Sequence, residues 1–226
     1  MSGGTYDFVV MGGGHNGLLS SIYLAKAGYK VCVLEALDEF GGGTRSGEIA
    51  PGYIADQGGM VHNLISRTPI VREDELELFS KYGLEYKFVD SLCCSIFPNE
   101  EHLILYSDLD KTCEQIAKFS ERDAETYREF VNYFLKLSGA AAAGTAGAIP
   151  AYGPMMNVLA MSPEGREFIR VMNSSAQQIV EEWFESEEVR VTLTRWCTEM
   201  MIDPRAIGTA TLLYFTSALH DPSNPG

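Results

Sequence analysis

A glycine-rich turn near the N-terminus constrains the fold of this chain more than any other feature of its sequence. The motif GGGHNG at residues 12–17 directly follows Tyr6–Met11, an apolar, β-branched run with the composition of a buried strand. Residues His15–Ala27 carry apolar side chains at helical spacing, and Lys30–Leu34 is a second apolar run with the composition of a buried strand. This order of strand, helix and strand predicts a right-handed βαβ unit with parallel strands, and therefore an α/β fold.

Each motif glycine fits a task that a larger residue would obstruct. Gly12 permits the tight turn from strand to helix, Gly14 lets the backbone approach a diphosphate, and Gly17 lets the helix pack against the sheet. The helix N-terminus then offers N–H groups and a positive dipole end to phosphate oxygens. Glu35, at the tip of the second strand, is placed to bind ribose hydroxyls and would repel a 2′-phosphate. The pattern predicts a dinucleotide site that disfavours NADP; the alternative is that the glycines serve only a tight turn.

Composition and charge narrow the classes of partner. The chain has 31 acidic against 17 basic residues and a formal net charge of −14, which repels phosphate backbones and argues against nucleic acid. No run approaches the roughly 18–20 consecutive apolar residues of a transmembrane helix, and the first residues lack the pattern of a secretory signal. The cysteines form no CxxC pair and the histidines have no metal-ligand spacing, so we expect no metal site and a cytoplasmic location.

The rest of the chain predicts short strands followed by helices. Residues 35–56 are expected to form loops, and residues 70–82 a helix that Gly83 ends. The expected strands, in an antiparallel meander, are 86–89, 93–97 and 103–106; the expected helices are about 120–137, with Ser120 as its cap, 163–172, 174–184, 187–200 and 206–219.

Residues 138–153 (SGAAAAGTAGAIPAYG) differ sharply in composition from their surroundings. They are small and uncharged and are interrupted by glycine and proline, which favours a linker or a mobile loop. The alternative is an apolar mouth or contact surface that Met155, Met156, Leu159 and Met161 continue. Methionine suits such a surface because its side chain adapts to irregular apolar contacts.

The stretch VLEALDEFGGGTRSGEIAPGYIADQGG at residues 33–59 resembles the extended FAD fingerprint of the flavin amine oxidase and phytoene desaturase superfamily. In that superfamily a glycine pair, here Gly41-Gly42, runs along the flavin side of the diphosphate. The pattern at residues 51–56 (PGYIAD) looks like the phytoene desaturase and carotene ketolase branch. Gly43 stands where amine oxidases usually carry an arginine, which also favours the desaturase-like branch. The resemblance continues, less specifically, at residues 74–86, 119–130 and 184–190.

The resemblance implies that FAD is the cofactor. The residues that it places at the cofactor are Gly12, Gly14, His15, Asn16, Gly17, Glu35, Ala36, Gly41, Gly42, Gly43, Thr44, Arg45, Asp56, Gly58 and Gly59. Asp56, His62 and Asn63 lie where the resemblance approaches the flavin. Asp56 and His62 are the weak catalytic candidates, although a histidine bonded to the backbone is the simpler interpretation of His62.

The predicted sheet is incomplete. Two parallel strands with one crossover bury too little surface to stand alone, and no β-branched run suited to another buried parallel strand follows Tyr106. In the family the remaining strands and a second FAD contact lie in a long C-terminal half. We therefore expect part of a split or cleaved enzyme, with an FAD-binding domain and meander at 1–110, a mostly helical substrate region at 111–226, and a second polypeptide that completes the sheet. The alternative is an independently folded fragment whose meander covers the sheet edge.

The implied reaction is a flavin-mediated dehydrogenation, desaturation or oxidation, in which hydride passes from a substrate carbon to flavin N5 and oxygen or a quinone reoxidises the flavin. A small, lipophilic or conjugated substrate follows from the family alone, and peripheral contact with a membrane is left open. A second hypothesis is a lipid-binding escort protein without redox chemistry, of which the Rab GDP-dissociation inhibitors are examples on this scaffold. The intact glycine motif and Glu35 argue against it.

Overall fold

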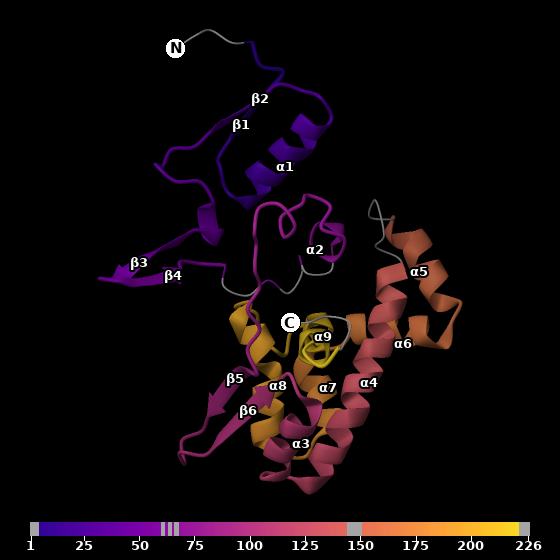
Figure 1. Cartoon of the computed structure of the whole chain (residues 1–226). Coiled ribbons are helices and arrows are strands. Elements are labelled where there is room, and N and C mark those ends of the chain that lie inside the picture. The colour runs from indigo at the N-terminus through magenta and orange to yellow at the C-terminus, as the bar shows by residue number, and fades with distance from the viewer. Residues whose placement is uncertain (1–4, 60–61, 63–64, 66–67, 144–150, 222–226) are drawn as a thin grey trace. The chain divides into compact units, whose positions relative to one another are not determined.

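The computed structural model describes residues 5–59, 62, 65, 68–143 and 151–221, and its internal contacts divide the chain into two units (Figure 1). The N-terminal unit spans Met1–Thr68 and carries the glycine-rich motif. The C-terminal unit spans Pro69–Gly226 and contains most of the helices. This boundary lies earlier in the chain than residue 110, so the assignment of functions to 1–110 and 111–226 stays a prediction.

The N-terminal unit begins with the predicted βαβ arrangement. Strand β1 (Phe8–Met11), helix α1 (His15–Lys26) and strand β2 (Val31–Leu34) all lie within two residues of their expected bounds. The strands pair in parallel, with Phe8 opposite Val31 and Met11 opposite Leu34. Parallel pairing requires the crossover that α1 provides. The predicted Rossmann-type α/β class is confirmed, with β1 and β2 forming a two-stranded sheet within the residues described.

The expectation that these strands are buried is wrong for this chain. Val9 is 59% exposed and Met11 is 87% exposed, and no hydrophobic side chain described between residues 5 and 68 is fully buried. The physical reason is that two strands and one helix cannot cover both faces of a parallel sheet. The strands have the apolar composition of a buried sheet, but the described residues of this unit do not pack over both of its faces.

Residues 35–56 were expected to form only loops, and this expectation is also wrong. They contain a 3-10 turn, η1 (Gly42–Thr44), and a hairpin of strands β3 (Ser46–Ala50) and β4 (Tyr53–Asp56). The hairpin is antiparallel, with Ser46 opposite Asp56. Its glycines and proline resemble loop composition, but Pro51 and Gly52 lie at the turn, where a hairpin tolerates them, and Gly47 pairs with Ala55 inside the hairpin.

The C-terminal unit is a hairpin followed by packed helices. Strands β5 (Ser91–Ile96) and β6 (His102–Tyr106) pair antiparallel. The helices that follow are α3 (Leu109–Ala117), α4 (Glu121–Ala143), α5 (Tyr152–Ala160), α6 (Pro163–Met172), α7 (Ala176–Trp183), α8 (Glu187–Glu199), the 3-10 helix η3 (Thr209–Leu213) and α9 (Tyr214–Ala218). Their fully buried side chains include Tyr127, Phe130, Ile179, Leu193 and Leu213. None of the helices that the structure describes is both long enough and apolar enough to cross a membrane.

The expected helix over 70–82 is limited to α2 (Pro69–Arg72). After it, Asp74 has a positive φ of 49°, and its carboxylate accepts hydrogen bonds from the N–H groups of Phe79 and Ser80 at 3.0 and 2.9 Å. An aspartate that binds nearby backbone donors competes with the helix for them. Residues 86–89 form no strand, so the expected meander is a two-stranded hairpin. Helices α3 and α5 were not expected, and the helix over 206–219 is divided into η3 and α9.

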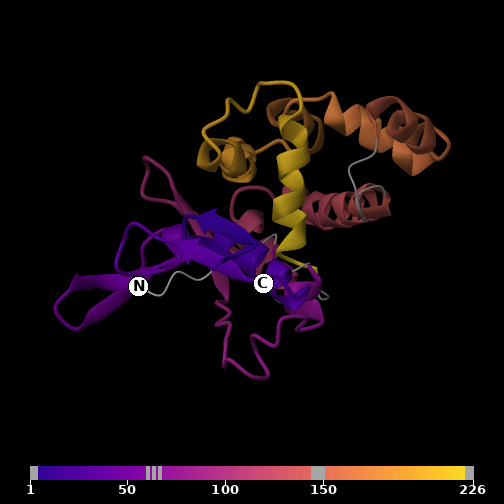
Figure 2. The ribbon, with the colours of Figure 1, turned by 90° about the horizontal axis from the view of Figure 1, so that it is seen from above.

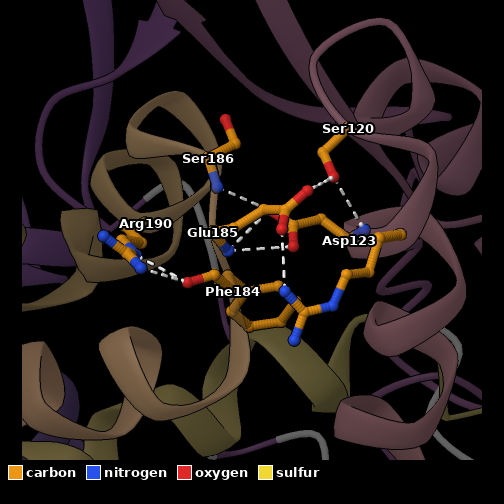
Figure 3. Close-up of polar contacts among 7 residues, drawn as sticks. Ser120, Asp123, Phe184, Glu185, Ser186 and Arg190 are labelled. Carbon is orange, nitrogen blue, oxygen red and sulfur yellow. Dashed lines mark hydrogen bonds and ion pairs between the residues drawn. The ribbon is translucent and has the colours of Figure 1, made fainter.

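A buried carboxylate joins the start of α4 to the connection between α7 and α8 (Figure 3). Asp123 is fully buried, and its two oxygens accept hydrogen bonds from the N–H groups of Glu185, at 3.0 and 3.2 Å, and Ser186, at 2.8 Å. The predicted cap Ser120 accepts a hydrogen bond from the Asp123 N–H at 3.1 Å. At the surface, Arg122 pairs with Glu185 at 2.7 Å. One side chain therefore satisfies backbone donors that burial would otherwise leave unpaired.

Candidate nucleotide-binding site

The turn from β1 to α1 leaves a helix N-terminus open. The Gly12 N–H donates to the Leu34 carbonyl at 2.7 Å, which ties the start of the turn to β2. The first intrahelical hydrogen bond runs from the Leu18 N–H to the Gly14 carbonyl at 2.9 Å. The N–H groups of His15 and Asn16 precede that bond and have no acceptor within the helix. Such an end attracts anions, because its N–H groups and the positive end of the helix dipole point the same way.

Two motif glycines have different surroundings, as their predicted tasks require. A Cβ on Gly17 would lie 2.1 Å from the Gly12 carbonyl oxygen, so only glycine fits between the helix and the turn. A Cβ on Gly14 would meet only the Gly42 Cα, at the ordinary contact distance of 3.8 Å. Gly17 is therefore required by packing within the chain. Gly14 instead borders space that the chain does not fill, which fits the approach of a diphosphate to the backbone.

Glu35 is held beside the glycine turn by three backbone donors. Its Oε2 accepts a hydrogen bond from the Gly13 N–H at 2.6 Å, and its Oε1 accepts from the N–H groups of Ala36 and Leu37 at 2.8 and 3.0 Å. The hydrogen bonds from Leu37 and Gly13 lower the pKa of Glu35 below its ordinary value. A carboxylate offers about four lone-pair sites, so a further donor such as a ribose hydroxyl can still be accepted.

The second glycine turn lies directly against the first. The Gly41 N–H donates to the Gly13 carbonyl at 2.8 Å, and Gly14 and Gly41 form an isolated parallel bridge. A Cβ on Gly42 would lie 2.9 Å from the Gly14 Cα, so the two backbones touch where neither has a side chain. Gly41 also has a φ of +119°, which other residues rarely adopt. The structure therefore places residues 41–43 directly beside the first glycine turn, next to Gly13 and Gly14.

A third glycine segment joins these two. The Gly59 N–H donates to the Gly43 carbonyl at 2.6 Å, and a Cβ on Gly58 would lie 2.6 Å from the same oxygen. The hairpin of β3 and β4 returns the chain to this position, with the Gln57 N–H donating to the Arg45 carbonyl at 2.9 Å. Glycines from three separate parts of the sequence thus converge on one exposed backbone surface, as a cradle for a diphosphate requires.

Thr44 and Arg45 are engaged with neighbouring groups. The Thr44 hydroxyl donates to the Gly41 carbonyl at 2.9 Å. The Arg45 guanidinium donates to Gln57 Oε1 at 3.0 and 3.2 Å, and it lies 3.9 Å from a carboxylate oxygen of Glu39. These contacts place Arg45 on the side of the third glycine segment rather than free at the surface.

The weak catalytic candidates also have local partners. Asp56 accepts a hydrogen bond from the Ser46 hydroxyl at 2.6 Å, within the β3–β4 hairpin. His62 Nε2 lies 2.9 Å from the Gly59 carbonyl, which can only accept, so that nitrogen donates. This backbone bond agrees with the simpler interpretation of His62. Asn63 lies outside the described residues, and a catalytic role for Asp56 or His62 stays a prediction.

Two residues at the site were not expected from the sequence. The Phe40 ring packs on Gly13, where an added Cβ would lie 2.2 Å from the ring Cδ1. Gln57 holds the Arg45 side chain, as described above. Phe40 directly precedes the glycine pair Gly41-Gly42, and this position is a sequence signal for the contact of its ring with Gly13. The contact of Gln57 with Arg45 depends on hairpin pairing and has no local signal.

A comparison with family models matches residues 10–73 to the NAD(P)-binding Rossmann-like domain. Among curated proteins, one subunit of the limonene dehydrogenase of Castellaniella defragrans is 30% identical over 223 residues, covering 95% of this chain and 39% of that protein. The 4,4'-diaponeurosporene oxygenase of Staphylococcus aureus is 27% identical over 132 residues, covering 57% of this chain and 26% of that protein. The predicted resemblance to the flavin amine oxidase superfamily is confirmed. The names of these relatives state a dehydrogenase and an oxygenase, which is the class of protein that the sequence predicts; an FAD-dependent oxidoreductase activity for this chain stays a prediction.

A solved structure supports the fold. A variant of putrescine oxidase with redesigned cofactor binding matches 97% of this chain and 44% of its own, with a TM-score of 0.60 and 18% identity. At this identity the match shows the fold alone. The chain spans less than half the length of these flavin amine oxidase relatives.

Proposed function

We propose that this chain supplies the ADP-binding part of an FAD-dependent dehydrogenase, desaturase or oxidase. FAD, when bound, would accept a hydride from a substrate carbon at its N5 atom. The observation that carries the proposal is the convergence of the three glycine segments on the open end of α1, with Glu35 held beside them. A tight turn alone would need Gly12 and Gly17 but would not need a second and a third glycine segment on the same surface.

The described residues have distinct roles in this proposal. The N–H groups at the start of α1 bind the diphosphate, and Glu35 binds the ribose hydroxyls and excludes a 2′-phosphate by its charge. Residues 41–43 continue along the diphosphate toward the flavin, because they lie against Gly14. Gly58 and Gly59 support that second turn from behind through the Gly43 carbonyl.

A second polypeptide completes the enzyme in this proposal. The chain spans 39% of its limonene dehydrogenase relative, whose name states that it is one subunit of an assembly. The exposed apolar strands β1 and β2 agree with a sheet that another segment extends. Affinity purification from the native source, followed by mass spectrometry and a visible spectrum, tests this directly. The expected result is a stoichiometric partner and flavin absorption bands in the same complex.

The substrate class is drawn from the relatives. Limonene and 4,4'-diaponeurosporene, in the names of two relatives, are apolar hydrocarbons, and we propose a small lipophilic substrate for this chain as well. Oxygen or a quinone is the proposed electron acceptor. A cytoplasmic location stays a prediction.

Gly14→Ala tests the nucleotide site without disturbing the fold. The added Cβ has ordinary space in the chain but would occupy the approach of the diphosphate, so we expect ADP affinity to fall by at least about tenfold. Isothermal titration of the purified chain with ADP measures this, and circular dichroism checks folding. Gly153→Ala is the matched control, because its Cβ would meet nothing within 4 Å and it lies in the other unit. Equal ADP affinity in Gly14→Ala and wild type would contradict the proposal.

A lipid-binding escort protein on the same scaffold is the alternative of another class. It predicts that the complex with the partner stays colourless when FAD is added, and that ADP does not bind. The cradle geometry favours the enzyme, because a scaffold without a cofactor has no use for an open helix end bordered by glycines.

A further inference from the structure

Residues 84–89, which lead into β5, have the shape of a strand but no partner strand among the residues described. Apolar and charged side chains alternate in their sequence (LEYKF) up to Phe88, with the period of a half-buried strand. The segment forms no helix, turn or bend. The rings of Tyr86 and Phe88 stack with their centroids 6.4 Å apart, as fits two side chains on one face of an extended chain.

The reason for the missing partner lies at the end of β6. The Ser107 N–H donates to the Asp90 carbonyl at 2.9 Å, which continues the pairing of β5 with β6 by one residue. The Asp108 carboxylate then caps α3, so the chain leaves the sheet at that point. Strand β6 therefore provides no ladder for residues 84–89.

The backbone groups of Glu85, Lys87 and Val89 face an open edge. The Leu84 N–H donates to the Leu78 carbonyl at 2.9 Å, so the even-numbered residues of the segment face their own unit. In an extended chain the N–H and C=O groups of the odd-numbered residues point the other way. None of these three odd-numbered residues has a backbone hydrogen bond to a residue that the structure describes.

Strand β5 continues this open edge. Strand β6 packs against α3 and α8, whereas β5 has no second strand beside it in the described part of the chain. Figures 1 and 2 show the tip of the β5–β6 hairpin extending beyond the helices of the C-terminal unit. In the segment before β5, Phe88 is 58% and Val89 is 63% exposed. An edge with unpaired backbone groups and exposed apolar side chains is a template for pairing with another strand.

We propose that residues 84–89 pair, along the edge formed by Glu85 and Lys87, with an extended segment of the second polypeptide. This inference rests on the part of the proposed function that assigns such a polypeptide. More than half of the limonene dehydrogenase relative lies outside the region that this chain matches, which provides a source for the segment. The incoming strand would carry an acidic side chain opposite Lys87, a basic one opposite Glu85, and apolar ones beside Leu84 and Phe88.

Two other occupants fit this edge less well. A lipid surface cannot cover it, because N–H and C=O groups without partners are not tolerated in hydrocarbon. A second copy of the chain would bring together two proteins that each carry a formal net charge of −14 and repel each other. A strand of another polypeptide satisfies the backbone groups and need not carry that charge.

Hydrogen exchange with mass spectrometry compares the free chain with the complex purified from the native source. We expect the amides of residues 85–89 to exchange at least about tenfold more slowly in the complex. Lys87→Pro removes an N–H from the open edge, so recovery of the second polypeptide should fall at least about tenfold. Lys87→Ala is the matched control, because it keeps that N–H and should recover nearly as much polypeptide as wild type. Circular dichroism should be unchanged in both variants.

Three results would overturn the proposal. One is a complex in which residues 85–89 exchange as fast as in the free chain. Another is an equal loss of the second polypeptide in Lys87→Pro and Lys87→Ala. The third is self-association of the free chain, detected by light scattering, that Lys87→Pro abolishes, because a second copy would then occupy the edge.

The proposed function fails in a different way. ADP titration reports on the nucleotide site in the other unit, so normal ADP affinity with unprotected amides at 85–89 would remove only the strand pairing. Protected amides in a complex that does not bind ADP would remove only the nucleotide site. If no second polypeptide is recovered at all, that part of the proposed function and this inference fail together, while the ADP result stands by itself.

Discussion

The two units of this chain are stabilised in opposite ways. The C-terminal unit has a contiguous core in which Tyr127, Phe130 and Leu193 are completely or almost completely buried. The described part of the N-terminal unit has no fully buried hydrophobic side chain, and its contacts are mainly backbone hydrogen bonds and close approaches between glycines. One unit is thus specified by side-chain packing, and the other by backbone geometry.

The difference follows from what each unit must do. A diphosphate is bound by bare backbone, so the residues that form its cradle cannot also form a hydrophobic core. As a consequence, apolar residues of strands β1 and β2 stay exposed in this unit, and another segment is needed to bury them. Stability and binding are therefore expected to respond to mutations in different units, which four experiments can test.

The largest effect is expected from truncating the core of the C-terminal unit. Phe130→Ala removes a fully buried ring that contacts Phe134, Trp183 and Phe184, and should lower the free energy of unfolding by about 3–5 kcal/mol. Val9→Ala, on the exposed strand β1, should cost less than about 1 kcal/mol. Urea unfolding followed by far-ultraviolet circular dichroism compares them. Equal costs would show that the N-terminal unit has a core after all.

Removing the buried carboxylate of the C-terminal unit should have the next largest effect. Asp123→Ala leaves the N–H groups of Glu185 and Ser186 without their acceptor, and we expect a loss of about 2–3 kcal/mol. Glu185→Gln is the control, because it affects only exposed contacts, the ion pair with Arg122 and the hydrogen bond from the Ser120 hydroxyl, and should cost about 0.5 kcal/mol or less. The same urea titration applies. A cost for Asp123→Ala as small as the control's would mean that water replaces the carboxylate.

Sequence patterns predicted elements best where a local signal sets both ends. Helix α6 matches the expected bounds 163–172, because Ser162 and Pro163 define its start. The sequence patterns gave a wrong prediction at 70–82, where the carboxylate of Asp74 accepts hydrogen bonds from backbone N–H groups that a helix would need. They also failed for α5, whose glycine and proline resemble a linker although packing against α6 makes it a helix.

For the site, the sequence predicted residue types but not their partners. The spacing of Gly12, Gly14, Gly17 and Glu35 is local and sufficed for the turn and the acid. The family resemblance added residues 41–45 and 58–59. Neither the glycine spacing nor the family resemblance indicated that Glu35 accepts a hydrogen bond from the Gly13 N–H, or that Gly58 packs on the Gly43 carbonyl. Such contacts depend on how separate segments meet, which no local pattern encodes.

Changing the acid of the N-terminal unit should affect binding more than stability. Glu35→Gln keeps one acceptor oxygen but places an NH₂ group against backbone donors, so we expect ADP affinity to fall about 10- to 30-fold, or about 1.4–2 kcal/mol. Glu39→Gln is the matched control, because Glu39 is an exposed acid at the edge of the site, 3.9 Å from Arg45. Isothermal titration measures both. Similar affinity for the two variants would remove Glu35 from the ribose site.

The smallest effect is expected from pH, and it should belong to the C-terminal unit. His220 Nδ1 lies 3.0 Å from the Ser107 carbonyl and therefore donates, so Nε2 accepts from the Tyr127 hydroxyl at 2.9 Å. Burial lowers the pKa of His220 below its ordinary 6.5, against weaker opposing effects of the Ser107 carbonyl and the Asp108 carboxylate. The unfolded chain therefore binds the proton first as pH falls, and the stability from neutral His220 is complete above pH 6.5 and lost below it.

Urea unfolding at pH 7.5 and 5.5 isolates this contribution. We expect wild type to lose more stability between these two pH values than His220→Gln, which has no group to protonate there. His102→Gln, at an exposed position of β6, should lose as much as wild type. If all three proteins lose the same amount, the neutral histidine is not stabilising the core. Since His220 and both of its partners lie in the C-terminal unit, ADP binding by the N-terminal unit should show no matching difference between wild type and His220→Gln. A shared pH response would instead mean that the two units are coupled, and that their separate modes of stabilisation are not independent.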